Sequence, residues 1–269
     1  MENFSDWLAT AEGLAQEASR AVMGFLGGPL ATERKADHSP VTAADLASDK
    51  ILREGLRKNF PRHAVLTEEN GLSGQEDSDY VWLIDPLDGT KAFAKGIPGF
   101  CVMVGLLKAG RPLLGVVVDP LEGRVYRAVR GQGASHSRGG KTEALRVSAR
   151  RDPKEMPWVV STGFPEAPLA RAQALLPGRL LPPINSVGIK VGLLARQEAD
   201  VYLNHHPVSY WDTAAPSLIL EEAGGRFTVL DGRPLDYALR PPFGHGVKTL
   251  ASNGPLHDEL VRRLAGVFD

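Results

Sequence analysis

The stretch from Val81 to Lys91, with the sequence VWLIDPLDGTK, constrains the fold more than any other part of the chain. The β-branched and aromatic residues from Tyr80 to Ile84 predict a buried strand. Pro86 has no N–H group, so we expect the hydrogen-bonded ladder to stop there. Asp85 is therefore expected at the end of a strand, with Asp88 one turn later.

The two residues that follow, Gly89 and Thr90, can open a helix whose first N–H groups have no partner inside the helix. Such groups can receive a phosphate oxygen. Beside the carboxylates of Asp85 and Asp88, a phosphate would be repelled unless divalent cations lay between them. The stretch thus indicates a site for a metal and a phosphoryl group, although an ordinary turn explains it equally well when it is taken alone.

Two other apolar segments are also bordered by acids. Glu68 and Glu69 follow the short strand predicted from Ala64, and Asp212 precedes the apolar run 213–220. A solvated face would scatter its acids at helical spacing, whereas these acids stand beside segments that must be buried. We therefore expect the acids to share one site.

Composition excludes several classes of function. Acidic and basic residues nearly cancel in the 269 residues, leaving a net charge of -1, so no global basic field favours nucleic acid or an anionic membrane. Cys101 is the one cysteine and no Cys/His cluster has zinc spacing, which indicates a reducing compartment. The acidic N-terminus has no signal-like or membrane-spanning pattern, and we expect a cytoplasmic enzyme.

The chain is expected to form two halves. Residues 1–145 predict an α+β half, with two amphipathic helices and an antiparallel meander from about Phe100 to Val129. The glycine-rich segment Gly131 to Gly140 is interpreted as a turn, because no helix pattern follows it. Residues 146–269 alternate strand and helix patterns, which is typical of an α/β half.

Together with Ser39-Pro-Val-Thr-Ala-Ala-Asp45, the three acidic segments resemble the motifs of the inositol monophosphatase superfamily of metal-dependent phosphatases. The resemblance extends from about Lys35 to Ala251. It implies a layered αβαβα sandwich with two sheets and a metal site in the cleft between the halves. Lys35 is interpreted either as a solvated lysine or as one that lies near the metals, as in many family members.

The resemblance also implies the site. It predicts two or three Mg²⁺ ions, a catalytic group and a set of residues on the substrate side. Asp45 is expected to bond the Thr90 hydroxyl and polarise the attacking water, although an acid at that place can also simply complement a helix dipole. The implied catalytic residues are Asp45, Thr90 and Glu68; the metal ligands Glu68, Asp85, Leu87 (carbonyl), Asp88 and Asp212; the phosphate- or substrate-binding residues Gly89, Thr90, Lys190, Asn204 and His205.

Several short segments of the sequence resemble 3′(2′),5′-bisphosphate nucleotidases most. Among them are Trp211-Asp-Thr-Ala-Ala215 and Gly232-Arg-Pro-Leu-Asp-Tyr237. This implies 3′-phosphoadenosine 5′-phosphate as substrate, with Lys190 as the cation for its second phosphate. Gly96-Ile-Pro-Gly-Phe100 is more similar to inositol monophosphatases or histidinol-phosphate phosphatases. A binding partner of the transcription machinery is the non-enzymatic alternative. The expected partner is a small phosphate monoester, and a homodimer is possible for the family.

Overall fold

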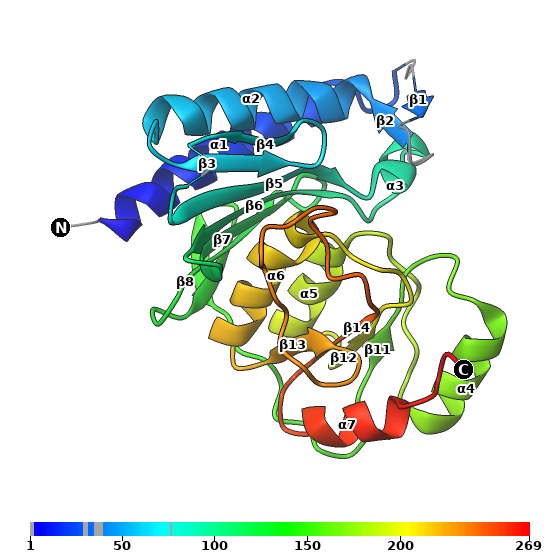
Figure 1. Ribbon diagram of the computed structural model, residues 1–269. Coiled ribbons are helices and arrows are strands. Elements are labelled where there is room, and N and C mark those ends of the chain that lie inside the picture. The colour runs from blue at the N-terminus through cyan, green and yellow to red at the C-terminus, as the bar shows by residue number, and fades with distance from the viewer. Residues whose placement is uncertain (1–2, 29–31, 35–39, 76) are drawn as a thin grey trace.

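The computed structural model describes residues 3–28, 32–34, 40–75 and 77–269, and Lys35 lies outside them. Five layers stack in Figure 1: two helices, an eight-stranded sheet, two helices, a four-stranded sheet and two more helices. The layered αβαβα sandwich expected from the sequence is confirmed.

The first layer consists of α1 (Phe4–Gly24) and α2 (Ala43–Asn59). Small apolar residues recur along one face of α1 at helical spacing and are fully buried against the sheet, which lets the helix approach closely. The backbone N–H and the hydroxyl of Thr42 both donate to Asp45, which fixes the start of α2. The buried face of α1 is formed by Ala11, Ala15, Ala18 and Val22.

The second layer is an eight-stranded sheet of order β10-β9-β8-β7-β6-β5-β3-β4, in which only the β3/β5 pair is parallel. Its central strands are buried on both faces, because helices cover both sides. The strands are β3 (Ala64–Thr67), β4 (Gly71–Gly74), β5 (Tyr80–Asp88), β6 (Cys101–Lys108), β7 (Arg111–Asp119), β8 (Arg124–Val129), β9 (Ala134–Arg138) and β10 (Lys141–Ala144).

Two expectations about this sheet need correction. β5 continues past Pro86 to Asp88, and its pairing with β6 shifts register between Asp85 and Asp88, so the proline interrupts the ladder without ending the strand. The segment Gly131 to Gly140 is not a simple turn, because it contains β9, which pairs with β8 and β10. Its strand residues are mostly polar and only partly buried, so they carry little of the apolar signal that marks a strand.

The third layer consists of α5 (Val187–Ala195) and α6 (Tyr210–Glu222), which lie between the two sheets. Glycines in the sheet let α6 approach almost to backbone contact. A Cβ atom at Gly115 would lie 2.8 Å from the carbonyl oxygen of Ala215. This later part of the chain therefore packs directly on a sheet built from the earlier part.

The fourth layer is the sheet β11-β12-β14-β13, in which only the β11/β12 pair is parallel, and α4 and α7 cover its outer face. A two-stranded ribbon, β1 with β2, and the short helix α3 stand beside α2. No helix in the described ranges is long and apolar enough to span a bilayer. The bounds are β11 (Trp158–Val159), β12 (Val201–Leu203), β13 (Arg226–Val229), β14 (Thr249–Ser252), α4 (Glu166–Leu175), α7 (His257–Leu264), β1 (Thr32–Arg34), β2 (Pro40–Thr42) and α3 (Thr90–Ala94).

Candidate active site

Acidic side chains from three elements gather at one end of the eight-stranded sheet. β3 runs parallel to β5, and the N–H of Glu68 donates to the carbonyl of Ile84 at 3.2 Å, so Glu68 follows β3 beside the end of β5. Asp85 and Asp88 belong to β5 itself. Asp212 lies in the first turn of α6. The charges of Glu68, Asp88 and Asp212 all act on Asp85, so the structure brings the four predicted acids together.

Burial and mutual repulsion make these carboxylates hard to ionise. Burial raises the pKa of Asp85 well above its usual value, and the charges of Glu68, Asp88 and Asp212 raise it further. Burial also raises the pKa of Asp212 to about 8, again with help from the charges of Asp88 and Glu68. Burial raises the pKa of Asp88 too, against the hydrogen bond from Ser186. Close carboxylates with raised pKa values are the arrangement that a bound cation relieves.

The donor set fits a hard divalent cation. Carboxylate and carbonyl oxygens suit Mg²⁺, and no Cys or His stands among the expected ligands. Within the described ranges, no group of three or more His, Cys, Asp or Glu side chains is placed so that it could hold a metal ion as it stands. The fit to Mg²⁺ therefore rests on the charge and the oxygen donors of the acids alone.

A threonine and an aspartate far apart in the sequence meet beside the acids. The Thr90 hydroxyl is placed to donate to Asp45 Oδ1 and to the Leu87 carbonyl, both at 3.1 Å. The N–H of Leu87 in turn donates to Asp85 Oδ1 at 3.1 Å. Asp45 also accepts the N–H of Thr42 at 2.8 Å, so it serves the helix start and the site at once. Both interpretations of Asp45 from the sequence agree with this geometry.

Two residues at the start of α5 hold the Asp88 side chain by hydrogen bonds. The sequence did not predict this contact. The Ser186 hydroxyl donates to Asp88 Oδ2 at 2.7 Å, and the N–H of Gly188 donates to the same oxygen at 3.1 Å. Ser186 is also the N-cap of α5, accepting the N–H of Ile189. A serine directly before a helical pattern is a visible cap signal, but nothing in the sequence shows that its hydroxyl reaches β5.

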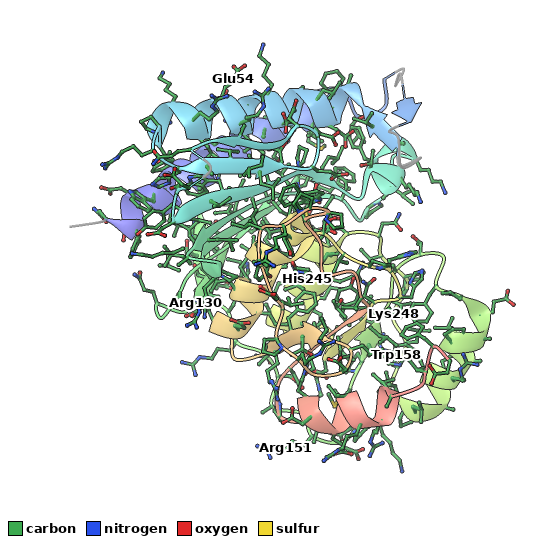
Figure 2. All side chains as sticks on the ribbon, viewed as in Figure 1. Glu54, Arg130, Arg151, Trp158, His245 and Lys248 are labelled. Atoms are coloured by element: carbon green, nitrogen blue, oxygen red, sulfur yellow. The ribbon has the colours of Figure 1, made fainter. Side chains whose placement is uncertain are left out.

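A buried network supports the first turn of α6. The Tyr237 hydroxyl donates to Thr213 Oγ1 at 3.2 Å, and His245 Nε2 lies 2.8 Å from the same oxygen. Figure 2 shows His245 inside the molecule beside this helix. The backbone N–H of Ser209 donates to Asp212 Oδ2 at 2.7 Å. These contacts fix the backbone that presents Asp212, and sequence reasoning did not find them.

A pocket of about 260 Å³ opens beside the acids. Its walls come from both parts of the chain, since residues after β3 and at the start of α3 face residues after β11, before α5 and after β12. It is lined by Glu68, Gly89, Thr90, Lys91, Ser161, Thr162, Asn185 and His206. A small polar molecule therefore has room next to the acids and the threonine.

Gly89 is required where α3 begins. Its φ is +92°, in the left-handed region, and a Cβ atom there would lie 2.3 Å from the carbonyl oxygen of Gly99. Any side chain would displace the backbone at the pocket wall. The chain thus keeps this wall open for a ligand to approach.

Lys190 does not occupy the place expected for it. It is fully buried, and its ammonium group donates to the carbonyls of Ile184 at 2.7 Å and Asn185 at 3.0 Å and to the Ser161 hydroxyl at 3.0 Å. It also lies 4.7 Å from the centre of the Tyr202 ring. A lysine whose three N–H groups are all used inside the protein has none left for a substrate. The expected direct contact is corrected to the positioning of two pocket walls.

The two other substrate-side residues are also turned inward. The Asn204 side chain donates to the His206 carbonyl at 2.6 Å and so shapes the loop. The His205 ring packs on Phe164 with ring centres 4.7 Å apart, and burial lowers the pKa of His205 to about 4. His206, and not His205, lines the pocket. Among the residues that sequence reasoning missed, Lys91 supplies a positive charge at this pocket.

Comparison with known proteins agrees with this geometry. The model of the inositol monophosphatase family matches residues 3–264. Among curated relatives, the 3′(2′),5′-bisphosphate nucleotidase CysQ of Escherichia coli is 36% identical over 234 residues, covering 86% of this chain and 93% of the relative. The histidinol-phosphatase of Streptomyces coelicolor is 33% identical over 274 residues and covers 97% of each chain. The Nus factor SuhB of Pasteurella multocida is 37% identical over 204 residues, covering 73% and 74%.

The fold has solved counterparts as well. The inositol monophosphatase from Anabaena superposes with a TM-score of 0.81 at 32% identity, covering 98% of this chain and 97% of that one. The family model matches most of the chain, and these relatives are matched over 74% or more of their own length. The chain belongs to the inositol monophosphatase family and is a phosphoric monoester hydrolase.

Proposed function

We propose that the chain is a Mg²⁺-dependent phosphomonoesterase that acts on a 3′(2′),5′-nucleoside bisphosphate such as 3′-phosphoadenosine 5′-phosphate. The observation that carries the reaction is the gathering of Asp85, Asp88 and Asp212, with raised pKa values, beside an open pocket. Glu68, Asp85, Asp88, Asp212 and the Leu87 carbonyl would hold the two or three ions. When bound, such ions lower the pKa of a water and steady the leaving oxygen.

The chain's own groups prepare the nucleophile and the phosphate. With its proton donated to Asp45, the oxygen of Thr90 can accept a hydrogen bond from the attacking water and hold it in place. Glu68 lies on the same pocket wall and adds a further acceptor for that water. Gly89 and Thr90 line the pocket, and their N–H groups would bind the phosphate oxygens, where negative charge is greatest.

The choice of substrate depends on the positive charge at the pocket, next to the expected phosphate position. Lys91 is exposed and lines the pocket together with His206, whose pKa is lowered by burial and then by the positive charge of Lys91. A second phosphate would be attracted by this side of the pocket, whereas the ammonium group of histidinol phosphate would be repelled. The identity to the relative named as a bisphosphate nucleotidase agrees with this choice.

Inositol 1-phosphate and histidinol phosphate are the alternative substrates, because proteins with those names or activities match this chain comparably well. The similarity to a protein named as a Nus factor supports a second, non-catalytic role in the transcription machinery. Such a role does not conflict with the site. We also propose that the protein forms a homodimer and is located in the cytoplasm. The buried thiol of Cys101, which forms no disulfide, supports the cytoplasmic location.

A substrate panel tests the proposal. Phosphate release is measured with Mg²⁺ and with EDTA for 3′-phosphoadenosine 5′-phosphate, inositol 1-phosphate, histidinol phosphate and fructose 1,6-bisphosphate. The nucleoside bisphosphate should give the highest kcat/KM, and EDTA should abolish release from all four. Activity that persists in EDTA would overturn the metal assignment. A higher kcat/KM for inositol 1-phosphate or histidinol phosphate would overturn the substrate assignment alone.

A further inference from the structure

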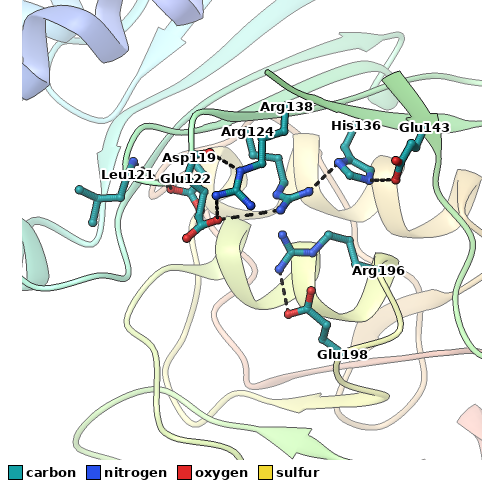
Figure 3. Close-up of polar contacts among 9 residues, drawn as sticks. All are labelled: Asp119, Leu121, Glu122, Arg124, His136, Arg138, Glu143, Arg196 and Glu198. Atoms are coloured by element: carbon teal, nitrogen blue, oxygen red, sulfur yellow. Dashed lines mark hydrogen bonds and ion pairs between the residues drawn. The ribbon is translucent and has the colours of Figure 1, made fainter. Parts of the chain in front are cut away.

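A second polar pocket, of about 480 Å³, lies where β8, β9 and β10 meet the C-terminal end of α5. Figure 3 shows the polar groups around it. We call it the arginine pocket, since Arg124, Arg146 and Arg196 line it together with His136. The acid cluster contacts the other end of α5, through Ser186 and Gly188. A helix of this length spans roughly 13 Å, so the two sites are separate.

Arg124 enters the pocket from the sheet. Its side chain is only 11% exposed, and one terminal nitrogen lies 2.8 Å from Nδ1 of His136. Its other terminal nitrogen is 3.9 Å from a Glu122 oxygen, which is a weak ion pair. The Nε–H is buried and has no hydrogen-bond partner among the described residues. Burial and the charge of Arg124 lower the pKa of His136, which favours the neutral ring whose Nδ1 can accept from Arg124.

Arg196 enters from the opposite wall, at the end of α5. Its side chain is 14% exposed and donates to Glu198 at 3.0 Å. The guanidinium lies 5.7 Å from the centre of the Tyr126 ring. Its Nε–H is also buried without a partner in the described part of the chain. A buried donor without a hydrogen bond destabilises the protein, and here two guanidinium groups each carry such a donor in one place.

The opposite charges lie farther out. Glu143, which is 3.5 Å from His136, is 69% exposed, and Glu198 is 54% exposed. Asp119 and Glu122 belong to the same network, but Asp119 accepts the N–H groups of Leu121 and Glu122 and does not line the pocket. The cations are thus held by the protein and the anions at the rim can turn into solvent.

The difference in burial between the arginines and the glutamates distinguishes the cluster from an ordinary surface ion-pair network. Exposed ion pairs contribute little, so moving Glu143 or Glu198 aside costs little. A tetrahedral oxyanion could then receive bidentate hydrogen bonds from two guanidinium groups that are already desolvated and held by His136 and Tyr126. We propose that the arginine pocket binds a small molecule that carries a phosphate or sulfate group.

Binding is tested by isothermal titration calorimetry. Inorganic phosphate and, separately, sulfate are titrated into the protein at constant ionic strength. EDTA is present throughout, so that no metal ion draws the anions into the active site. The wild type should show saturable binding of at least one anion. R124Q and R196Q should each weaken it about tenfold or more, as expected for a lost charge-assisted contact. R130Q is the matched control, because Arg130 pairs with Glu221 on another surface, where Figure 2 labels it.

A gain-of-binding variant guards against misfolding of the arginine variants. E143Q/E198Q removes only exposed rim carboxylates and should tighten anion binding several-fold, while phosphatase activity in Mg²⁺ stays unchanged. Wild-type protein without saturable binding of either anion would overturn the proposal. Equal anion affinity in R130Q and R196Q would also overturn it. The same holds if E143Q/E198Q binds the anion no more tightly than the wild type. None of these outcomes depends on which ester the active site hydrolyses.

Discussion

Replacing Asp212 by asparagine should stabilise the metal-free protein and at the same time remove its metal-dependent activity. Burial raises the pKa of Asp212 to about 8, and the charges of Asp88 and Glu68 add to the effect. Asparagine has nearly the same shape and can still accept the N–H of Ser209, which Asp212 accepts at 2.7 Å. The substitution therefore removes little but the charge.

The size of the effect follows from the pKa. A rise from 3.8 to about 8 corresponds to roughly 6 kcal/mol at most, at 1.36 kcal/mol per pKa unit. The gain will be smaller, because neighbouring acids share the repulsion and a neutral side chain in the first turn loses up to about 1 kcal/mol of interaction with the helix dipole. We expect a net stabilisation of about 1–3 kcal/mol, which raises Tm by about 2–5 °C for a chain of this size.

The dependence on pH has a definite sign. The unfolded chain releases the Asp212 proton near its ordinary pKa, whereas the folded protein keeps it up to about pH 8. The wild type therefore loses stability as pH rises between these two values, and D212N does not share this contribution. The difference in Tm between the two proteins should be near zero at about pH 4 and greatest at pH 8 and above.

Thermal unfolding followed by circular dichroism, in EDTA and at several pH values, measures this difference. D6N is the matched control, because Asp6 also lies in the first turn of a helix but outside the acid cluster. It should gain no stability. If D212N melts at or below the wild-type temperature at pH 8 in EDTA, then repulsion within the cluster does not determine its stability and the reasoning is refuted.

Three further predictions concern the pocket. In steady-state assays, T90A and D45N should each lower kcat by about 10²-fold with little change in KM. The double variant should lose no more activity than either single variant. Additive losses would show that the two residues act independently. K91M should raise KM about tenfold for the nucleoside bisphosphate and leave KM for a simple monophosphate unchanged. K190M should raise KM for both substrates by the same factor. The reverse pattern would show that Lys190 contacts the substrate directly. G89A should lower both Tm and kcat, because its Cβ would lie 2.3 Å from a backbone oxygen, and unchanged values would show that the wall can move.

The acids were predictable because each stands beside an apolar segment, and a strand end is visible in the sequence. Glu68 and Asp85 come together because β3 and β5 are parallel neighbours that end at the same edge, a pairing that the sequence pattern did not predict. The approach of Asp45 to Thr90 needed the family resemblance, since these residues are 45 positions apart and nothing local links them. The layered fold followed from the same resemblance.

Lys190 shows why the rest was not predictable. An isolated lysine in a helical pattern suggests either a solvated charge or a ligand contact, and the protein uses neither. Its acceptors are two backbone carbonyls and one hydroxyl, groups whose direction depends on the tertiary path of the chain. The polar strand β9 was missed for a related reason, because its pairing depends on backbone groups and its side chains give little apolar signal.

The position of α6 between the sheets bears on how the chain can be dissected. Residues such as Met103 and Val117 of the eight-stranded sheet are buried against Leu218 and Ile219 of this helix. A fragment that ends at about residue 145 would leave that apolar surface bare and should aggregate. Two fragments cut within 145–157, a stretch outside regular secondary structure, should instead find each other and restore the phosphatase when they are produced in one cell. This segment is therefore a suitable place to split the enzyme into a reporter that reassembles.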